Sequence, residues 1–292
     1  MSFKSIALIA RQQRTGATET LQELVDFLVK KNCKVWIEES SKNLLGNRSI
    51  PVISFNQLDQ KIDLIIVIGG DGSLLHAAKT AVKHAIPIIG INRGTLGFLT
   101  DITPEEACVK IAEILNGDFK EEQRGLLQTD IHHHGATVAT GLALNDIVLL
   151  PGKDSAQMIE FDISVNKEFV CHQRSDGLIV ATPTGSTAYA LSAGGPIMSP
   201  DVDALTLVPM FPHTLSMRPL VVPTNSKIKI TIANELETKP RISCDGETPI
   251  DVPAGGHIHI EKSQYALRLL HPKNYEYFDT LRQKLHWGEK LC

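Results

Sequence analysis

Long apolar runs are absent from this sequence of 292 residues. No stretch approaches the roughly 20 consecutive apolar residues that a membrane-spanning helix needs. The first ten residues also lack the long apolar region and the small-residue cleavage site of a secretory signal. We therefore expect a cytoplasmic protein without a membrane partner.

An excess of positive charge is also absent. The chain has 29 Lys and Arg against 33 Asp and Glu, a formal net charge of -4. No overall positive field can recruit nucleic acid, so we expect no nucleic-acid partner, and any recognition of phosphate must be local. The five cysteines form no C-x-x-C pair and are predicted to be reduced and mostly structural: Cys33, Cys108, Cys171, Cys244 and Cys292.

Strands and helices alternate in the first part of the chain, which predicts a Rossmann-like α/β domain over residues 1–120. A third predicted helix starts at Thr103-Pro104-Glu105-Glu106, with threonine as its cap, and stops at Asn116-Gly117. Before it, strands are predicted at residues 5–10, 34–37, 63–68 and 86–91, and helices at 18–31 and after residue 72.

The pattern changes beyond residue 121 to short segments punctuated by glycine, proline, asparagine and aspartate. Apolar and polar residues alternate at 161–165 and 228–232, as in strands with one buried and one solvated face. This predicts a second, all-β domain over residues 121–270. Residues 271–292 are predicted to form a helical tail that returns to the N-terminal domain.

A glycine-rich turn, Gly69-Gly70-Asp71-Gly72, lies between a predicted buried strand and a helix. This arrangement exposes backbone N–H groups at the positive end of a helix and can bind phosphate. An aspartate there would repel bare phosphate unless it binds a metal or accepts a substrate proton. The alternative is a tight turn in which Asp71 caps the helix. Leu75 replaces the third glycine of G-x-G-x-x-G, and the Gly-Lys-Ser/Thr of a Walker A motif is missing.

A second polar concentration runs from Arg174 to Tyr189. Its hydroxyl groups and small residues can hydrogen-bond a sugar or a base, and Tyr189 can stack on a ring. The alternative is a hairpin loop rich in Ser and Thr. Ser186 does not lie in a G-x-S-x-G elbow, which disfavours a serine hydrolase.

Three smaller features have structural explanations of their own. Asn145-Asp146 suits ribose hydroxyls, but both residues are also common in turns. Asp245-Gly246 resembles a hairpin turn. The run His132-His133-His134 invites a metal hypothesis, yet adjacent residues on a strand point to opposite faces, so no metal ligand is predicted there.

Taken together, these segments resemble the NAD kinase family in its proteobacterial form. The matching segments span nearly the whole chain and keep their order and spacing: Gly69 to Gly72, Gly90 to Thr100, Asn145-Asp146, Asp176 to Tyr189, Gly194 to Ile197, Pro212 to Ser216 and Arg218-Pro219. The run Thr-Pro-Thr-Gly-Ser-Thr-Ala-Tyr is the most specific of them.

The resemblance implies transfer of the γ-phosphoryl group of ATP to the 2′-hydroxyl of the adenosine ribose of NAD, giving NADP. It further implies a divalent metal, most often magnesium. The implied fold is an N-terminal α/β domain followed by a C-terminal β-sandwich domain whose loops bind NAD. The implied assembly is a homo-oligomer, a dimer or a tetramer.

The resemblance also implies a set of site residues. Asp71 is the implied proton acceptor and the only implied catalytic residue. Asp146 stands where many relatives have glutamate, so the contact of Asp146 with the ribose could be longer or shifted. The implied binding residues are Gly69, Gly70, Gly72 and His76 for phosphate, Asn145 and Asp146 for ribose, Arg174 and Asp176 for the nicotinamide end, and Thr187, Ala188, Tyr189 and Ser192 for adenine. Ala190, Leu191 and Asp245 are implied binding residues without an assigned part of the ligand.

Other functions stay open on the residues alone. Lipid kinases share the glycine-aspartate turn and phosphofructokinases have a similar one, although the polar loop from Thr182 to Tyr189 argues against a lipid acceptor. A non-catalytic NAD sensor and a redox enzyme that uses NAD as a hydride carrier are further alternatives.

Overall fold

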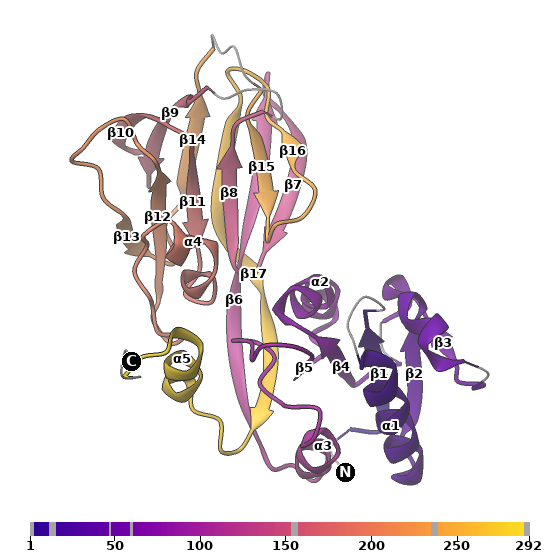
Figure 1. Ribbon diagram of the computed structural model, residues 1–292. Coiled ribbons are helices and arrows are strands. Elements are labelled where there is room, and N and C mark those ends of the chain that lie inside the picture. Colours follow the sequence, from indigo (N-terminus) through magenta and orange to yellow (C-terminus); the bar gives the residue numbers. More distant parts are fainter. Residues whose placement is uncertain are drawn as a thin grey trace. The chain divides into compact units, whose positions relative to one another are not determined.

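The computed structural model describes residues 3–11, 16–46, 48–58, 61–152, 157–234 and 239–288. The chain forms two compact units (Figure 1). The first comprises Met1–Gln123 and Ala266–Cys292, and the second comprises Arg124–Tyr265. In these described ranges, no helix is long and apolar enough to cross a membrane.

A parallel sheet forms the centre of the first unit, in the order β17-β5-β4-β1-β2-β3. Its strands are β1 (Ser5–Ala10), β2 (Lys34–Glu38), β3 (Val52–Ile53), β4 (Leu64–Gly69), β5 (Ile88–Asn92) and the end of β17 (His257–Pro272). The helices are α1 (Ala17–Lys30), α2 (Asp71–Ala81), α3 (Ala107–Leu115) and α5 (Tyr277–Leu285), with 3-10 turns η1 (Glu39–Leu45), η2 (Phe55–Gln57) and η3 (Val82–His84).

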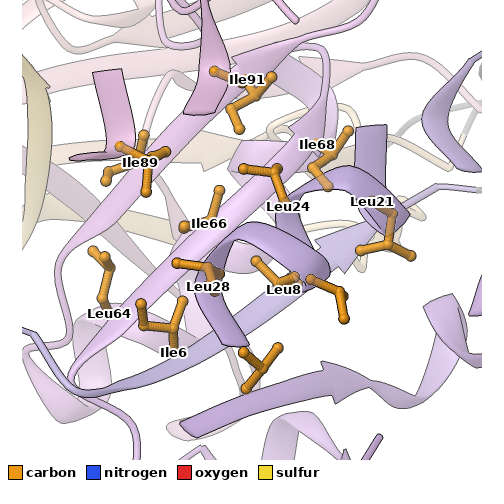
Figure 2. Packing of buried hydrophobic residues seen from close by; sticks show 14 of the residues in the cluster. Ile6, Leu8, Leu21, Leu24, Leu28, Leu64, Ile66, Ile68, Ile89 and Ile91 are labelled. Atoms are coloured by element: carbon orange, nitrogen blue, oxygen red, sulfur yellow. The ribbon is translucent and has the colours of Figure 1, made fainter. Parts of the chain in front are cut away.

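Apolar side chains of α1 pack on the sheet to form the core of this unit (Figure 2). Leu21, Leu24 and Leu28 recur at helical spacing and are fully buried. They belong to one cluster with Ile6 of β1 and Ile66 of β4. Every residue of β4 is buried, as expected for a central parallel strand covered on both faces.

The start of α3 differs from the prediction. The helix begins at Ala107, and residues 104–106 form a turn in which the N–H of Ala107 donates to the carbonyl of Pro104. The Thr103 hydroxyl donates to the carboxylate of Glu106, 3.2 Å away, so its hydrogen bond goes to a side chain. The predicted threonine cap at this position is therefore wrong, whereas the helix does stop before Asn116-Gly117.

Two antiparallel sheets form the second unit. The first is β10-β9-β14-β17, with β6 paired to β17 and β7 to β6, and the second is β13-β12-β11-β8-β15-β16. The elements are β6 (Phe119–His133), β7 (Ala136–Ala143), β8 (Asp146–Leu150), β9 (Ile159–Val165), β10 (Glu168–Ser175), β11 (Gly177–Ala181), η4 (Gly185–Thr187), α4 (Tyr189–Ser192), β12 (Ala204–Met210), β13 (Leu220–Pro223), β14 (Ile228–Ile232), β15 (Arg241–Cys244) and β16 (Ile250–Asp251).

One buried cluster takes side chains from both sheets of this unit. Phe161 and Ile163 come from β9, and Leu178 and Val180 come from β11. The alternation along β9 buries one face and leaves the other partly solvated, which is the pattern of a β-sandwich. The strands β6 and β17 contain the boundaries between the two units, so the chain passes between them within continuous strands.

Candidate active site

The glycine-rich turn connects β4 to α2 in the first unit. Gly69 ends the strand, Gly70 is the residue before the helix, and Asp71 is the first helical residue. Gly70 is extended and no side chain caps the helix, so Asp71 is not the cap of α2. Gly72 is exposed, and a Cβ added there would meet nothing within 4 Å. The N-terminal end of the helix is thus free of side-chain obstruction at Gly72.

The Asp71 carboxylate is held by the backbone of residues 98–100. Its Oδ2 accepts the N–H of Phe98 at 2.8 Å. Its Oδ1 accepts the N–H of Leu99 at 3.1 Å, and the N–H and the hydroxyl of Thr100 at 3.2 and 3.0 Å. Because a carboxylate oxygen offers about two lone pairs, Oδ1 is saturated and Oδ2 keeps one acceptor position.

The same loop is tied to the end of β5 by Asn92, whose side chain is buried. Its Nδ2 donates to the carbonyl of Thr95 at 2.8 Å, and to the carbonyl and hydroxyl oxygens of Thr100 at 3.3 and 3.1 Å. Gly97 allows the loop to approach Asp71, because a Cβ at residue 97 would lie 2.0 Å from Asp71 Oδ1. Arg93 donates to the carbonyl of Gly16.

No periodic pattern points to this arrangement. Asn92, Gly97 and Thr100 belong to a segment that carries the family resemblance, but no role was predicted for them from the sequence. The available signal was the clustering of glycine and small polar residues after a buried strand, which commonly marks a functional loop. Figure 2 shows buried side chains of the neighbouring strands β4 and β5, the two strands that precede the glycine turn and this loop.

His76 lies on the exposed side of α2, one helical turn after Gly72. Its ring contacts Phe55 edge-on, with 5.2 Å between the ring centroids. Residues four apart share one face of a helix, so His76 follows Gly72 on the same face.

In the second unit, the Asp245 carboxylate organises the segment that connects β7 to β8. It accepts the N–H groups of Leu144, Asn145 and Asp146 at 2.9, 2.8 and 3.2 Å. Asp245 and Gly246 both have positive φ angles of 54° and 69°, which fits the predicted turn. The sequence alone did not reveal that the Asp245 side chain also holds a segment about 100 residues away.

The turn after β11 packs against that segment. The Thr182 N–H donates to the carbonyl of Asn145 at 2.9 Å, and its hydroxyl donates to the carbonyl of Leu144 at 2.6 Å. A Cβ at Gly185 would lie 2.1 Å from the carbonyl oxygen of Asn145, so only glycine permits this approach. Asn145 Oδ1 is buried and, within the described part of the chain, accepts no hydrogen bond. Asp146 is buried as the first residue of β8.

Tyr189 and Ser192, the first and last residues of α4, line a cavity of about 420 Å³ in this unit. Tyr189 is 44% exposed as a residue and therefore accessible to a ligand. The other lining residues are mostly apolar: Ala193, Pro209, Met210, Phe211, Pro212, Met217 and Pro219. The cavity combines apolar walls with two hydroxyl groups, which suits a flat heterocycle.

The remaining predicted residues near this cavity differ in exposure. Ala190 is fully buried against Ile179 and Val208, whereas Ala188 and Leu191 are half-buried. The Thr187 hydroxyl donates to the carbonyl of Thr184 at 3.3 Å.

Arg174 and Asp176 are joined to the wall of the cavity through the backbone. The Asp176 N–H donates to the carbonyl of Met210, and the His213 N–H donates to the carbonyl of Arg174, both at 3.0 Å. The Arg174 Nε lies 3.5 Å from Glu160 Oε1, across the β9–β10 pair, and both side chains are largely exposed.

The histidine run lies at the end of β6. The ring of His132 contacts His259 edge-on at 4.9 Å between centroids, and His133 contacts His134 at 3.9 Å. Among the residues that the structure describes, no group of three or more His, Cys, Asp or Glu side chains could hold a metal ion.

Comparisons with known proteins identify relatives of both units. Residues 6–119 match the family profile described as ATP-NAD kinase N-terminal domain. Residues 144–272 match the profile described as ATP-NAD kinase C-terminal domain. The NAD kinase of Coxiella burnetii is 52% identical over 291 residues, which cover 100% of this chain and 97% of the relative. The NAD kinase of Pseudomonas syringae is 48% identical over 289 residues, covering 99% and 97%.

Solved structures share the fold. The yeast NADH kinase complexed with NADH superposes with a TM-score of 0.91 at 24% identity, covering 100% of this chain and 90% of the yeast protein. An NAD kinase from Archaeoglobus fulgidus in complex with ATP gives a TM-score of 0.71 at 27% identity, covering 96% and 99%. The predicted fold class, an α/β domain followed by a β-sandwich domain, is therefore confirmed.

Proposed function

This chain belongs to the ATP-NAD kinase family, and from that premise we propose that it transfers the γ-phosphoryl group of ATP to the 2′-hydroxyl of the adenosine ribose of NAD. The products are NADP and ADP. The observation that carries the proposal is the Asp71 carboxylate, which backbone N–H groups fix in place while Oδ2 keeps one acceptor position. Phosphoryl transfer depends mainly on such positioning and on charge stabilisation.

The N-terminal end of α2 is the proposed site for the transferred phosphate. The first N–H groups of a helix have no partner within the helix, and the helix dipole favours negative charge there. Gly72 leaves this end open, because it has no side chain to cover it. Gly69 and Gly70 let the backbone approach the phosphates, and His76 lies one turn along the same face.

Asp71 is proposed to orient the ribose hydroxyl and to accept its proton. The 2′-oxygen forms a bond to the γ-phosphorus while the bond from that phosphorus to ADP breaks, and the hydroxyl proton passes to Asp71 Oδ2. A carboxylate is a weak base toward an alcohol, so the proton transfer takes place late, when the oxygen–phosphorus bond is already forming.

The loops of the second unit are proposed to bind NAD. Asn145 and Asp146 suit the ribose, and the buried Asn145 Oδ1 is an acceptor available to a hydroxyl. The cavity beside Tyr189 and Ser192 suits the adenine ring. Arg174 and Asp176 are proposed for the nicotinamide end. Asp245 serves this site through the three N–H groups that it accepts, and Ala190 serves it by anchoring α4.

A divalent metal ion, most suitably Mg²⁺, is proposed to arrive with ATP. Magnesium binds largely through substrate phosphates and water and needs few protein ligands. The ion would neutralise charge on the phosphates.

A homo-oligomer, either a dimer or a tetramer, is proposed for the assembled enzyme. The second unit exposes large apolar side chains, including Phe211, Leu215 and Val221, which are 76%, 94% and 49% exposed. Exposed apolar side chains of this size are suited to a contact with a second copy of the chain. We also propose a cytoplasmic location for the protein.

Incubation of the protein with NAD, ATP and Mg²⁺ tests the proposal. NADP is then measured with a dehydrogenase that requires the 2′-phosphate, and samples without ATP serve as controls. ATP-dependent formation of NADP is the expected result. Tight NAD binding without product would instead indicate a sensor, and a change in nicotinamide absorbance without added dehydrogenase would indicate hydride transfer.

A further inference from the structure

A fully buried histidine near the end of β17 lies between two carboxylates of the first unit. His271 Nδ1 is 2.9 Å from Asp101 Oδ2, and Nε2 is 3.6 Å from Glu122 Oε2 on β6. The side chains of Asp101 and Glu122 are 6% and 12% exposed. The imidazole stacks on the ring of Tyr275 with 3.8 Å between centroids and an interplanar angle of 7°. These contacts determine both the position and the plane of the ring.

The surroundings favour the protonated ring. Burial lowers the pKa of His271, but the Asp101 and Glu122 carboxylates raise it by more, so this pKa lies above the ordinary histidine value. The protonated imidazole donates to Asp101 and pairs with Glu122. Lys120 pairs with the other oxygen of Glu122 at 3.0 Å, and its Nζ lies 5.5 Å from the Tyr275 ring centroid.

Asp101 connects this histidine to the reacting carboxylate. It directly follows Thr100, whose N–H and hydroxyl both donate to Asp71. On its other side, Ile102 exchanges backbone hydrogen bonds with Asn92 and Gly90 of β5. Besides the Asn92 side chain, the Asp101 side chain is therefore a second anchor of the loop, at the point where the loop leaves Asp71.

We propose that His271 is a positioning residue for phosphoryl transfer, acting through Asp101 on the loop that holds Asp71. The mechanistic part rests on the proposed function. A buried pair of ionic groups costs desolvation and is often no more stabilising than apolar side chains, but it defines one geometry. Here the ionic pair of His271 and Asp101 fixes the position of residues 98–100. Within the described part of the chain, these three residues donate all the hydrogen bonds that the Asp71 carboxylate accepts.

Two His271 variants and two controls test the proposal. His271→Leu removes both polar contacts. His271→Asn keeps an amide donor close to the place of Nδ1 and thus restores part of the Asp101 contact. Leu270→Val perturbs the adjacent, fully buried residue on the opposite face of β17. Glu122→Gln removes the second carboxylate and leaves the Asp101 contact in place.

Two measurements are made on each variant. Hydrogen exchange of the peptide covering residues 96–101 reports the loop without requiring activity. Steady-state kinetics of NADP formation report kcat and KM. For His271→Leu we expect exchange at least about tenfold faster in that peptide, as loss of a charged hydrogen bond allows. We expect kcat about 10- to 100-fold lower, as for a displaced catalytic group.

The expected kinetic signature is a loss of kcat with KM values for ATP and NAD within about twofold of wild type, since binding groups are untouched. His271→Asn should recover part of kcat, and Leu270→Val should turn over like wild type. Glu122→Gln, which keeps the Asp101 contact, should lose less kcat than His271→Leu. A His271→Leu variant whose loop exchanges like wild type would overturn the proposal, as would normal kcat in a variant with a loosened loop. If the wild-type protein makes no NADP, the proposed function fails, and the exchange data alone still decide whether His271 holds the loop.

Discussion

Thr100 contacts Asp71 at two points, through its backbone N–H at 3.2 Å and its hydroxyl at 3.0 Å. The same hydroxyl accepts the side-chain N–H of Asn92 at 3.1 Å. A continuous chain of hydrogen bonds therefore runs from β5 through Thr100 to the Asp71 carboxylate. Its middle member is a single hydroxyl group, which can be removed with little change in side-chain volume.

Replacement of Thr100 by Val should lower kcat by about tenfold, because a displaced carboxylate aligns the ribose hydroxyl less well. Thr100→Ser, which keeps the hydroxyl, is the matched control and should retain most of the activity. Thr100→Val loses the hydrogen bond from this hydroxyl to the Asp71 carboxylate and the one that it accepts from Asn92. Together these losses cost about 2–4 kcal/mol, which is less than the stability of a typical domain, so both variants should fold. Initial rates of NADP formation and thermal melting curves check this. Wild-type turnover in Thr100→Val would show that the hydroxyl has no part in catalysis.

Replacement of Asp71 by Asn should reduce turnover by about 10²-fold or more, because the amide cannot accept the proton. Its amide NH₂ also faces backbone N–H donors, which loosens residues 98–100. NAD binding takes place on the loops of the second unit in our proposal and should stay largely intact. Isothermal titration with NAD and single-turnover assays separate the two effects. Near-normal turnover would remove Asp71 from its catalytic role.

The helices, strands and turns of the first unit could be predicted from the sequence. The contacts between residues far apart in the chain could not. The unbroken apolar run of β4 and the glycines after it predicted the strand, the turn and the following helix. Nothing in that pattern indicates that Asp71 binds backbone donors 27 to 29 residues away. Such pairing depends on how β4 and β5 lie side by side, which is a property of the packed sheet.

Replacement of Gly72 by Ala should raise the KM for ATP by about tenfold while leaving the fold intact. The added Cβ meets no protein atom within 4 Å, and alanine is a better helix former than glycine, so thermal stability should be equal or higher. The methyl group would instead occupy the space proposed for the phosphates. Kinetics at varied ATP and thermal melting check both parts.

Gly97→Ala is the contrasting variant, because its Cβ would lie 2.0 Å from Asp71 Oδ1 and 2.3 Å from Thr100 Oγ1. It should lower kcat and stability together. An unchanged KM for ATP in Gly72→Ala would place the phosphates elsewhere.

The second unit shows the same limit of prediction. Positive φ at Asp245 and Gly246 agrees with the turn that the sequence indicates. The carboxylate of Asp245 also accepts N–H groups from residues 144–146, which connect β7 of one sheet to β8 of the other. Two segments that each resembled an ordinary turn thus form one structure, and only the pairing of β15 with β8 brings them together.

Replacement of Asp245 by Ala should raise the KM for NAD by about tenfold and lower stability by about 1–3 kcal/mol, because three N–H groups lose their acceptor. Asp245→Asn keeps one acceptor oxygen and should show a smaller effect on both. The KM for ATP should change by less than about twofold in either variant. Titrations with NAD and urea unfolding curves supply the measurements. An Asp245→Ala variant with unchanged NAD affinity would show that the 144–146 segment does not bind NAD.

The contribution of His271 to stability should fall as pH rises. Burial lowers the pKa of this imidazole, and Asp101 and Glu122 raise it by more, so it lies above the unfolded value of about 6.5. An imidazole that holds its proton more tightly in the folded state than in the unfolded state stabilises the fold. This stabilisation is fully present at pH values below the unfolded pKa. That stabilisation disappears as pH rises through the folded pKa. Lys120 and Tyr275 are the other titratable groups beside this site. Both are present in the wild type and in the His271→Asn variant, so they do not contribute to a difference between the two.

Urea unfolding of wild type and His271→Asn between pH 6 and pH 9 measures this contribution as the difference between their free energies of unfolding. We expect the difference to be largest near pH 6 and to shrink steadily toward high pH, because only the wild type loses a proton from this site. A difference that stays constant over the range would show that residue 271 contributes through packing alone. A difference that grows with pH would mean that the buried ring is neutral in the folded protein, with its pKa below the unfolded value.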